Sequence, residues 1–189
     1  MDEFGLIARY FKPLDSVRQE ISVGIGDDGA VIRPRSGRSI VVAVDTLVEG
    51  QHFPTCLDAY SVGFRAAATS LSDLAAMGAH PLYATLALTL PNMDEGWVSS
   101  FACGFGDAIR KSDTVLIGGD TTRGPLSITV QVIGDVENNR HLSRAGAKHN
   151  DIVVVSGTLG DARGGLEMLI DGQSASYDRF LLDRLKSPT

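Results

Sequence analysis

Residues 82–90, with the sequence LYATLALTL, alternate strictly between two kinds of side chain. Successive side chains of a β-strand point to opposite faces, so the pattern predicts a strand with one wholly apolar side. An apolar side of this kind has to be buried against a second layer, which restricts the chain to a layered fold. The positions on the apolar side are Leu82, Ala84, Leu86, Leu88 and Leu90.

Two segments on either side of this strand have helical spacing. Residues 58–79 are rich in Ala, with Asp58 as a candidate N-cap and Gly78 at the end. A second helix begins near Asp94 and carries an unbroken i, i+4 stripe, for which core packing is preferred over a cofactor site. The stripe consists of Trp97, Phe101, Phe105 and Ile109.

Three further runs predict strands. Residues 39–45, SIVVAVD, are β-branched and apolar and end in an acid, which indicates a buried strand. Residues 114–119 form a short apolar strand, and residues 127–136 alternate. The resulting order, strand–helix–strand–helix–strand–strand, is that of an α/β or α+β fold.

The pattern restarts near residue 150. Residues 151–158, DIVVVSGT, predict a strand, and residues 162–170 predict a short helix. The residues from there to the end are too few for an independent domain. We therefore expect an N-terminal domain over residues 1–148 and the incomplete beginning of a C-terminal domain over residues 149–189.

The charge and composition exclude several classes of partner. The 189 residues include 17 Lys and Arg and 23 Asp and Glu, so the formal charge is −6, which argues against a nucleic-acid partner. No apolar run reaches the roughly 20 residues that span a bilayer, and the N-terminus does not resemble a secretory signal. Cys56 and Cys103 lie in no metal-binding pattern and are expected to be reduced. We expect a cytoplasmic protein without a membrane partner.

Five aspartates lie in apolar or glycine-rich surroundings. Four separate segments supply them, usually at a strand end or a turn, where a carboxylate is costly to bury without a cation or donors. Each one alone has an ordinary interpretation as a cap or turn residue. Together they predict a site for Mg²⁺, which pairs a few carboxylates with water and substrate phosphates. They are Asp27 and Asp28 in GIGDDGA, Asp45 in VAVDTL, Asp73 in SLSDLAAMGA and Asp120 in LIGGDTTRG.

Glycines directly precede two of these acidic segments. Small residues let a backbone approach phosphate closely and offer N–H donors to an anion. Neither GxxxxGK[ST] nor GxGxxG is present, so a bound nucleotide would depend on metals and carboxylates. We expect Asp28, Asp45, Asp73 and Asp120 to converge on one divalent-cation site.

The motifs resemble those of the thiamine-monophosphate kinase family, within the superfamily typified by aminoimidazole ribonucleotide synthetase. The resemblance runs from LIARYF at residues 6–11 almost to the last residue. The combination of DTLVEGQHF, LSDLAAMGA and LIGGDTTRGP is the most specific part of it, whereas GDD is shared across the superfamily. GIGDD, LALTLP and SRAGAK follow the same order and spacing.

The resemblance implies ATP-dependent phosphorylation of thiamine monophosphate to thiamine diphosphate with Mg²⁺, and no acid or base catalyst is assigned. Gly119 and Asp120 match an ATP-contacting step, Arg144 matches a nucleotide-phosphate contact, and His52 matches a contact to thiamine phosphate. The residues that match magnesium ligands or their neighbours are Asp27, Asp28, Asp45, Asp73 and Asp120. Ala43 and Val44 replace residues that often carry hydroxyl groups in relatives, so only their backbone carbonyls could serve there.

The expected fold is α+β, with a mixed sheet of about four strands, helices on one face, and the start of a second α/β domain. The resemblance implies a homodimer formed through the sheets, and the apolar side of residues 82–90 suits such burial. Two other functions stay open: another ATP-dependent synthetase of the superfamily, and a truncated, non-catalytic module for nucleotide binding and dimerisation. A synthetase would share GDD and GGD but not DTLVEGQHF followed by LSDLAAMGA.

Overall fold

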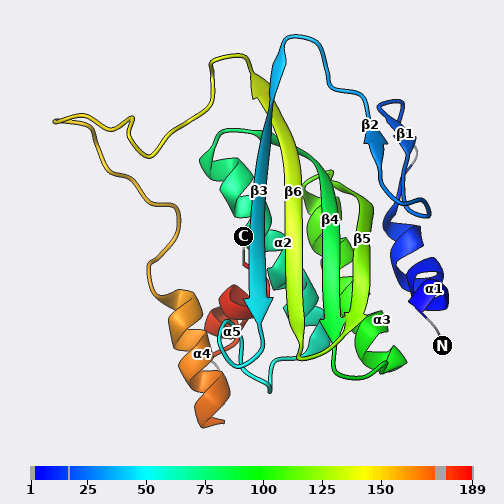
Figure 1. Cartoon of the computed structure of the whole chain (residues 1–189). Coiled ribbons are helices and arrows are strands. Elements are labelled where there is room, and N and C mark those ends of the chain that lie inside the picture. Colours follow the sequence, from blue (N-terminus) through cyan, green and yellow to red (C-terminus); the bar gives the residue numbers. More distant parts are fainter. Residues whose placement is uncertain (1–2, 17, 173–177, 189) are drawn as a thin grey trace.

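A four-stranded mixed sheet forms the centre of the protein (Figure 1). In this computed structural model, which describes residues 3–16, 18–172 and 178–188, the strand order is β3-β6-β4-β5. β4 and β5 are parallel, and the other neighbouring strands are antiparallel. The strands are β3 (Arg38–Val48), β4 (His80–Leu90), β5 (Val115–Arg123) and β6 (Ser127–Glu137).

Two long helices, α2 (Ala59–Ala76) and α3 (Glu95–Lys111), cover one face of this sheet (Figure 1). Both begin at the predicted caps: Asp58 accepts a hydrogen bond from the amide of Ser61, and Asp94 accepts from two amides of the first turn of α3. The predicted α+β class and the helices on one face are therefore confirmed.

The two helices touch each other through their backbones. A Cβ atom on Gly63 would lie 2.1 Å from the carbonyl oxygen of Phe101, and one on Gly104 would lie 1.9 Å from that of Tyr60. No side chain fits at either position, so glycine permits the close crossing. The aromatic stripe of α3 lies in the core as expected, with Phe101 and Phe105 fully buried.

The apolar side of β4 is buried by the chain's own helices. Ala84, Leu86, Leu88 and Leu90 belong to the core that α2 and α3 close, and each is at most 4% exposed. The expectation that a second copy buries this side is therefore wrong, because alternation alone does not tell which layer covers a strand.

The opposite face of the sheet is open over β3, which is an edge strand. Ile40, Val42 and Val44 are 44%, 54% and 59% exposed, so the prediction of a buried strand at residues 39–45 is wrong for this face of β3. An edge strand with β-branched residues on both faces has the same composition as a central one, which explains the error.

Short elements at the N-terminus pack along the β5 edge (Figure 1). Leu6 and Phe11 are 1% and 5% exposed and anchor this region in the main core. Elements this short carry little periodicity and were not predicted. They are α1 (Glu3–Leu6), the helical turns η1 (Ile7–Phe11) and η2 (Lys12–Leu14), and the paired strands β1 (Ile21–Val23) and β2 (Val31–Ile32).

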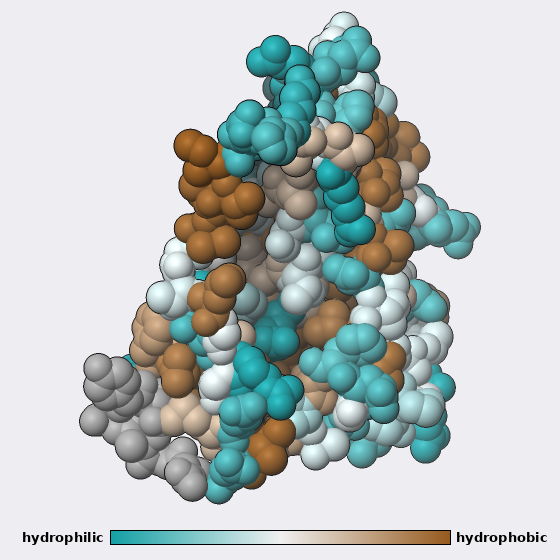
Figure 2. Space-filling model, turned by 90° about the vertical axis from the view of Figure 1, so that its left-hand side faces the viewer, coloured by the Kyte–Doolittle hydropathy of each residue, from teal (hydrophilic) through white to brown (hydrophobic). Residues whose placement is uncertain are grey.

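Residues 138–160 contain neither helix nor strand and leave the sheet on its β3 side (Figure 1). The strand predicted over residues 151–158 is therefore absent. Side chains 152–155 are between 62% and 92% exposed, because no described strand lies beside them to pair with their backbone. Figure 2 views the molecule from this side and shows hydrophobic atoms at its surface.

The last described elements are the helices α4 (Asp161–Asp171), which matches the predicted helix over residues 162–170, and α5 (Asp178–Lys186). They pack closely, since a Cβ on Gly165 would lie 2.2 Å from the carbonyl oxygen of Leu181. The pair is attached to α2, because Arg65 donates to the carbonyl oxygen of Leu185 and Lys186 forms an ion pair with Asp58.

Across the described ranges, no helix has the length and apolar character needed to cross a membrane. Cys56 and Cys103 are both free and exposed.

Candidate metal and nucleotide site

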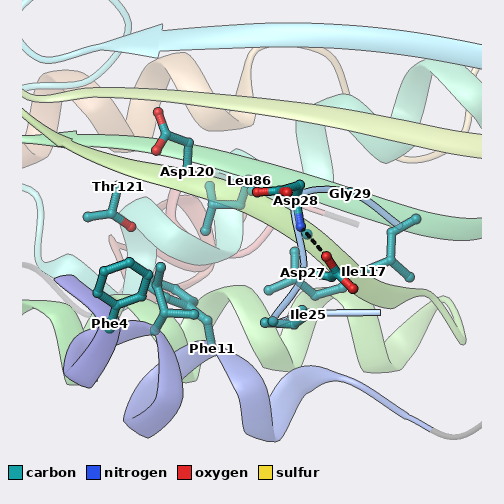
Figure 3. A pocket seen from close by; sticks show the side chains of 15 residues that line it. Phe4, Phe11, Ile25, Asp27, Asp28, Gly29, Leu86, Ile117, Asp120 and Thr121 are labelled. Carbon is teal, nitrogen blue, oxygen red and sulfur yellow. Dashed lines mark hydrogen bonds between the residues drawn. The ribbon is translucent and has the colours of Figure 1, made fainter. Parts of the chain in front are cut away.

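A cavity of about 430 Å³ opens at the β5 edge of the sheet (Figure 3). One part of its wall is acidic and rich in glycine and comes from residues 25–29 and 118–121. Another part is apolar and includes Phe4, Ile7 and Phe11 from the N-terminal helical turns. Small-molecule sites in proteins have volumes of roughly 300–1,000 Å³, so the cavity is large enough for a ligand.

Asp27 and Asp28 lie in the turn between β1 and β2. Gly26 has a φ of 122°, which disfavours any side chain, and the backbone amide of Asp28 donates to Oδ1 of Asp27 over 2.9 Å. The Asp27 carboxylate is thus engaged in the turn, and in Figure 3 it points away from the side on which Asp120 lies. The Asp28 carboxylate points toward that side and has no hydrogen-bond or ion-pair partner among the described residues.

Asp120 follows an irregularity in β5. Leu116 pairs with Ala84 and Gly118 pairs with Thr85, so Ile117 is an extra residue in the ladder. A bulge of this kind bends a strand and redirects its side chains, and bulges are frequent beside active sites. The bend brings the backbone of β5 close to β4, because a Cβ on Gly119 would lie 2.0 Å from the carbonyl oxygen of Leu86. Asp120 comes next and lines the cavity.

The chemistry of this wall suits a magnesium ion that is shared with phosphate. Mg²⁺ in nucleotide sites commonly takes one or two carboxylates and fills its other positions with water and phosphate oxygens. Asp28 and Asp120 are both exposed on the cavity wall and can supply those carboxylates. Within the described residues, no group of three or more His, Cys, Asp or Glu side chains could hold a metal by itself.

Asp45 and Asp73 do not join this cavity within one chain. β3 and β5 form opposite edges of the sheet, which separates Asp45 from Asp120 by three strand spacings, about 14 Å. Asp73 is exposed on the outer surface of α2. The expected convergence of four acidic segments is therefore not found in the single chain, since strand order is not visible in the sequence.

His52 lies in the loop between β3 and α2 and lines a second cavity of about 190 Å³. Arg65 and the inner faces of α4 and α5 complete the wall of this second cavity. Nδ1 of His52 accepts a hydrogen bond from the amide of Val48 over 3.0 Å. Because Nδ1 is the acceptor, a neutral His52 ring carries its proton on Nε2 and can donate it to a ligand.

Arg144 lies in the exposed segment between β6 and α4. It lines neither cavity described above. The N-terminal wall of the first cavity was missed by sequence reasoning, although Phe4, Ile7 and Phe11 recur at helical spacing and could have marked an amphipathic turn.

The sequence profile described as AIR synthase related protein, N-terminal domain, matches residues 26–136. The chain belongs to the AIR synthase-related family. The match begins within the GDD turn and extends through the whole four-stranded sheet almost to the end of β6. The two segments that carry Asp28 and Asp120 therefore lie inside the family domain.

Relatives within this family include thiamine-monophosphate kinases. The enzyme of Escherichia coli (strain K12) is 48% identical over 181 residues, covering 93% of this chain and 56% of the relative. The structure of thiamine-monophosphate kinase from Stenotrophomonas maltophilia K279a has a TM-score of 0.87 at 43% identity, covering 100% of this chain and 62% of that chain. The structure of AaThiL complexed with AMPPCP and TMP has a TM-score of 0.77 at 33% identity. The match covers 99% of this chain and 59% of that chain.

These comparisons confirm the resemblance that the motifs indicate. They also show that the chain spans little more than half the length of the E. coli relative.

Proposed function

We propose that the cavity at the β5 edge binds ATP together with Mg²⁺. We further propose that the whole protein transfers the γ-phosphoryl group of ATP to thiamine monophosphate, giving thiamine diphosphate and ADP. The observation that carries this proposal is the juxtaposition of the GDD turn and the GGD step on one cavity wall. The similarity to AaThiL, whose complex holds AMPPCP and TMP, supports the choice of substrates.

Asp28 and Asp120 are the proposed metal ligands of this chain, and Asp27 supports them by holding the turn. Gly119 and the neighbouring glycines leave room for phosphate to approach the backbone. Mg²⁺ would supply neutralisation of phosphate charge, which phosphoryl transfer requires more than covalent chemistry. No side chain is assigned as a general acid or base.

The site also requires parts that one copy of this chain does not bring together. We propose that Asp45, Asp73 and Arg144 act on the metal and the nucleotide only in the assembled, longer protein, and that His52 contacts the thiamine phosphate. A homodimer formed through the open face of the sheet would cover Ile40, Val42 and Val44. Residues 149–189 would then begin a second domain, in which residues 151–158 pair as a strand. A biosynthetic kinase that uses ATP is expected in the cytoplasm.

The experiment is a comparison of two proteins, the 189-residue chain and the protein encoded by the full reading frame. Each is incubated with ATP, Mg²⁺ and thiamine monophosphate, and thiamine diphosphate is measured by chromatography. We expect turnover by the longer protein, its loss in an Asp120→Asn variant, and little or none by the 189-residue chain. Reacting atoms must be held about 3–3.5 Å apart, and one cavity wall alone does not position both substrates.

Each other outcome has a defined meaning. Release of ADP that does not depend on thiamine monophosphate would favour another synthetase of the superfamily. Binding of ATP without turnover by the longer protein would favour a non-catalytic module. Efficient turnover by the 189-residue chain would contradict the need for the longer protein.

A further inference from the structure

The β1–β2 pair is attached to the main sheet through a small apolar cluster that is separate from the main core. Among the described residues the two sheets share no strand pairing, so side chains hold them together. Ile21 of β1 and Ile32 of β2 lie opposite each other and pack on the cluster. The buried members of the cluster come from β4 and β5 and are at most 3% exposed: Leu82, Tyr83, Val115 and Ile117. This cluster therefore also holds the turn that carries Asp27 and Asp28.

Ile117 differs from the other buried members of this cluster in its position. It is the extra residue in the β5 ladder, and the GGD step that ends in Asp120 follows it directly. It also lines the first cavity, which Leu82 and Val115 do not. In Figure 3 it lies on the side of the cavity where the turn of Asp27 lies. One buried side chain thus connects the segment that carries Asp28 with the segment that carries Asp120.

The distance between these two carboxylates depends on packing, because they come from separate segments of the chain. Isoleucine is branched at Cβ and has few rotamers, so a buried isoleucine between the segments is a stiff spacer. Mg²⁺ requires nearly ideal octahedral geometry with oxygens at roughly 2.0–2.1 Å, whereas Ca²⁺ accepts irregular geometry at roughly 2.3–2.6 Å. Carboxylates held at a fixed distance can therefore favour Mg²⁺, and carboxylates that are free to move cannot.

We propose that Ile117 is a positioning residue that sets the distance between Asp28 and Asp120 and thereby the preference of the site for Mg²⁺ over Ca²⁺. This inference rests on the proposed function, which makes these two aspartates metal ligands. Ile117 offers no ligand atom and acts only through the two segments that it separates. Removal of its side chain leaves both carboxylates in place but lets the β1–β2 pair move relative to β5.

The test measures ATP binding by isothermal titration calorimetry, once in saturating Mg²⁺ and once in saturating Ca²⁺, with the protein encoded by the full reading frame. We expect Ile117→Ala to weaken ATP binding about tenfold in Mg²⁺, as for loss of a group that supports a metal ligand, and less than about threefold in Ca²⁺. Leu82→Ala is the matched control, since it removes an isomeric side chain from the same cluster outside the cavity. It should lower the melting temperature by a similar amount and leave both ATP affinities unchanged.

Ile117→Val is a milder second variant that loses a single methyl group. It should show the same change to a smaller degree, about threefold in Mg²⁺, and it carries the test if Ile117→Ala does not fold.

Three other results would overturn the inference, and they differ in what they leave intact. An unchanged ratio of the Mg²⁺ and Ca²⁺ affinities in both Ile117 variants would give Ile117 a purely structural role while the proposed nucleotide site stands. An equal loss of the Mg²⁺ preference in Leu82→Ala would assign the effect to the stability of the whole cluster. Absence of metal-dependent ATP binding by the unchanged protein would remove the proposed function itself.

Discussion

The backbone amide of Asp28 donates a hydrogen bond to the carboxylate of Asp27 over 2.9 Å. The Asp27 carboxylate therefore stabilises the turn, whereas the Asp28 carboxylate is left to bind a metal. We expect Asp28→Asn to weaken Mg²⁺ binding in the presence of ATP by about tenfold or more. Mutation of a residue that only supports a metal ligand already lowers metal affinity roughly 10–100-fold. Asp27→Asn should mainly lower the melting temperature and retain most of the Mg²⁺ affinity. The measurement is the Mg²⁺-dependent rise in melting temperature, which follows from mass action. Equal effects of the two variants would contradict this division.

Asp73 should matter for turnover and not for folding. It is exposed and lies near the C-terminal end of α2, where the helix dipole disfavours a negative charge. Asp73→Asn should therefore leave the free energy of unfolding unchanged or raise it by a few tenths of a kcal/mol. In the longer protein, it should lower turnover roughly a hundredfold or more, as expected for loss of a charge-stabilising group. Ser72→Ala is the control, since Ser72 is also exposed on α2. Near-normal activity of Asp73→Asn would exclude Asp73 as a metal ligand.

The glycine contact between α2 and α3 gives a prediction about stability. A Cβ on Gly63 would meet a backbone oxygen of α3 at 2.1 Å, so the helices must separate in Gly63→Ala. We expect a loss of about 2 kcal/mol or more in urea unfolding, the range of an overpacked core. Gly96→Ala in α3 would approach only a side-chain oxygen at 3.3 Å and should be neutral or stabilising by up to about 1 kcal/mol. Similar stability of both variants would disprove the close crossing.

Tyr60 and Asp107 connect α2 and α3 at the surface, and their pKa shifts predict a pH dependence. The hydroxyl of Tyr60 donates to Asp107 over 2.6 Å, which lowers the pKa of Asp107 and raises the pKa of Tyr60 to about 12. The stability that comes from Asp107 is present above its ordinary pKa of 3.8 and is lost as the pH falls through its lowered value. The stability linked to Tyr60 is present below its ordinary pKa of 10.0 and is lost as the pH rises toward 12.

Tyr60→Phe should therefore destabilise the protein more at pH 7 than at pH 2. Urea unfolding at the two pH values measures the difference. Nuclear magnetic resonance titration should show the pKa of Asp107 moving up toward its ordinary value in the variant. A destabilisation that does not change with pH would show that the hydrogen bond is not maintained in solution.

The open face of the sheet predicts self-association. Val44 is 59% exposed on this face, and a lysine there would place a charge in the proposed interface. We expect Val44→Lys to weaken the dimer at least about tenfold in sedimentation equilibrium. Val31→Lys is the control, since Val31 is 53% exposed on β2, outside the four-stranded sheet. A chain that is monomeric at all concentrations, with or without the substitution, would contradict the proposal.

The elements of the main sheet and both long helices were predictable because each has either a local period or a short run of apolar residues. Asp58 and Asp94 marked helix starts, and the alternation in residues 82–90 marked β4. The strand order was not predictable, because it depends on contacts between distant segments that local periodicity does not record. Residues 151–158 have the composition of a strand, yet a strand needs a neighbour, and none of the described strands pairs with them.

The same limit applies to the site. Asp28 and Asp120 were singled out by the glycines around them, and the structure places both on one cavity wall. Asp45 was chosen because it ends an apolar strand, but that strand is at the far edge of the sheet. The aromatic wall was overlooked because Phe4 and Phe11 look like ordinary core residues until the ring of Phe4 is found in solvent.

The exposed residues 152–155 bear on how the protein folds during its synthesis. The main core is built from residues between Leu6 and Val136, so it can close on the ribosome as soon as β6 has emerged. The four β-branched residues emerge later and have no strand to pair with at that moment. They are a template for pairing with any other free strand, including the same run in a neighbouring nascent chain. In the longer protein proposed above, aggregation of the nascent chain would therefore be most favoured in the interval before a partner strand is synthesised.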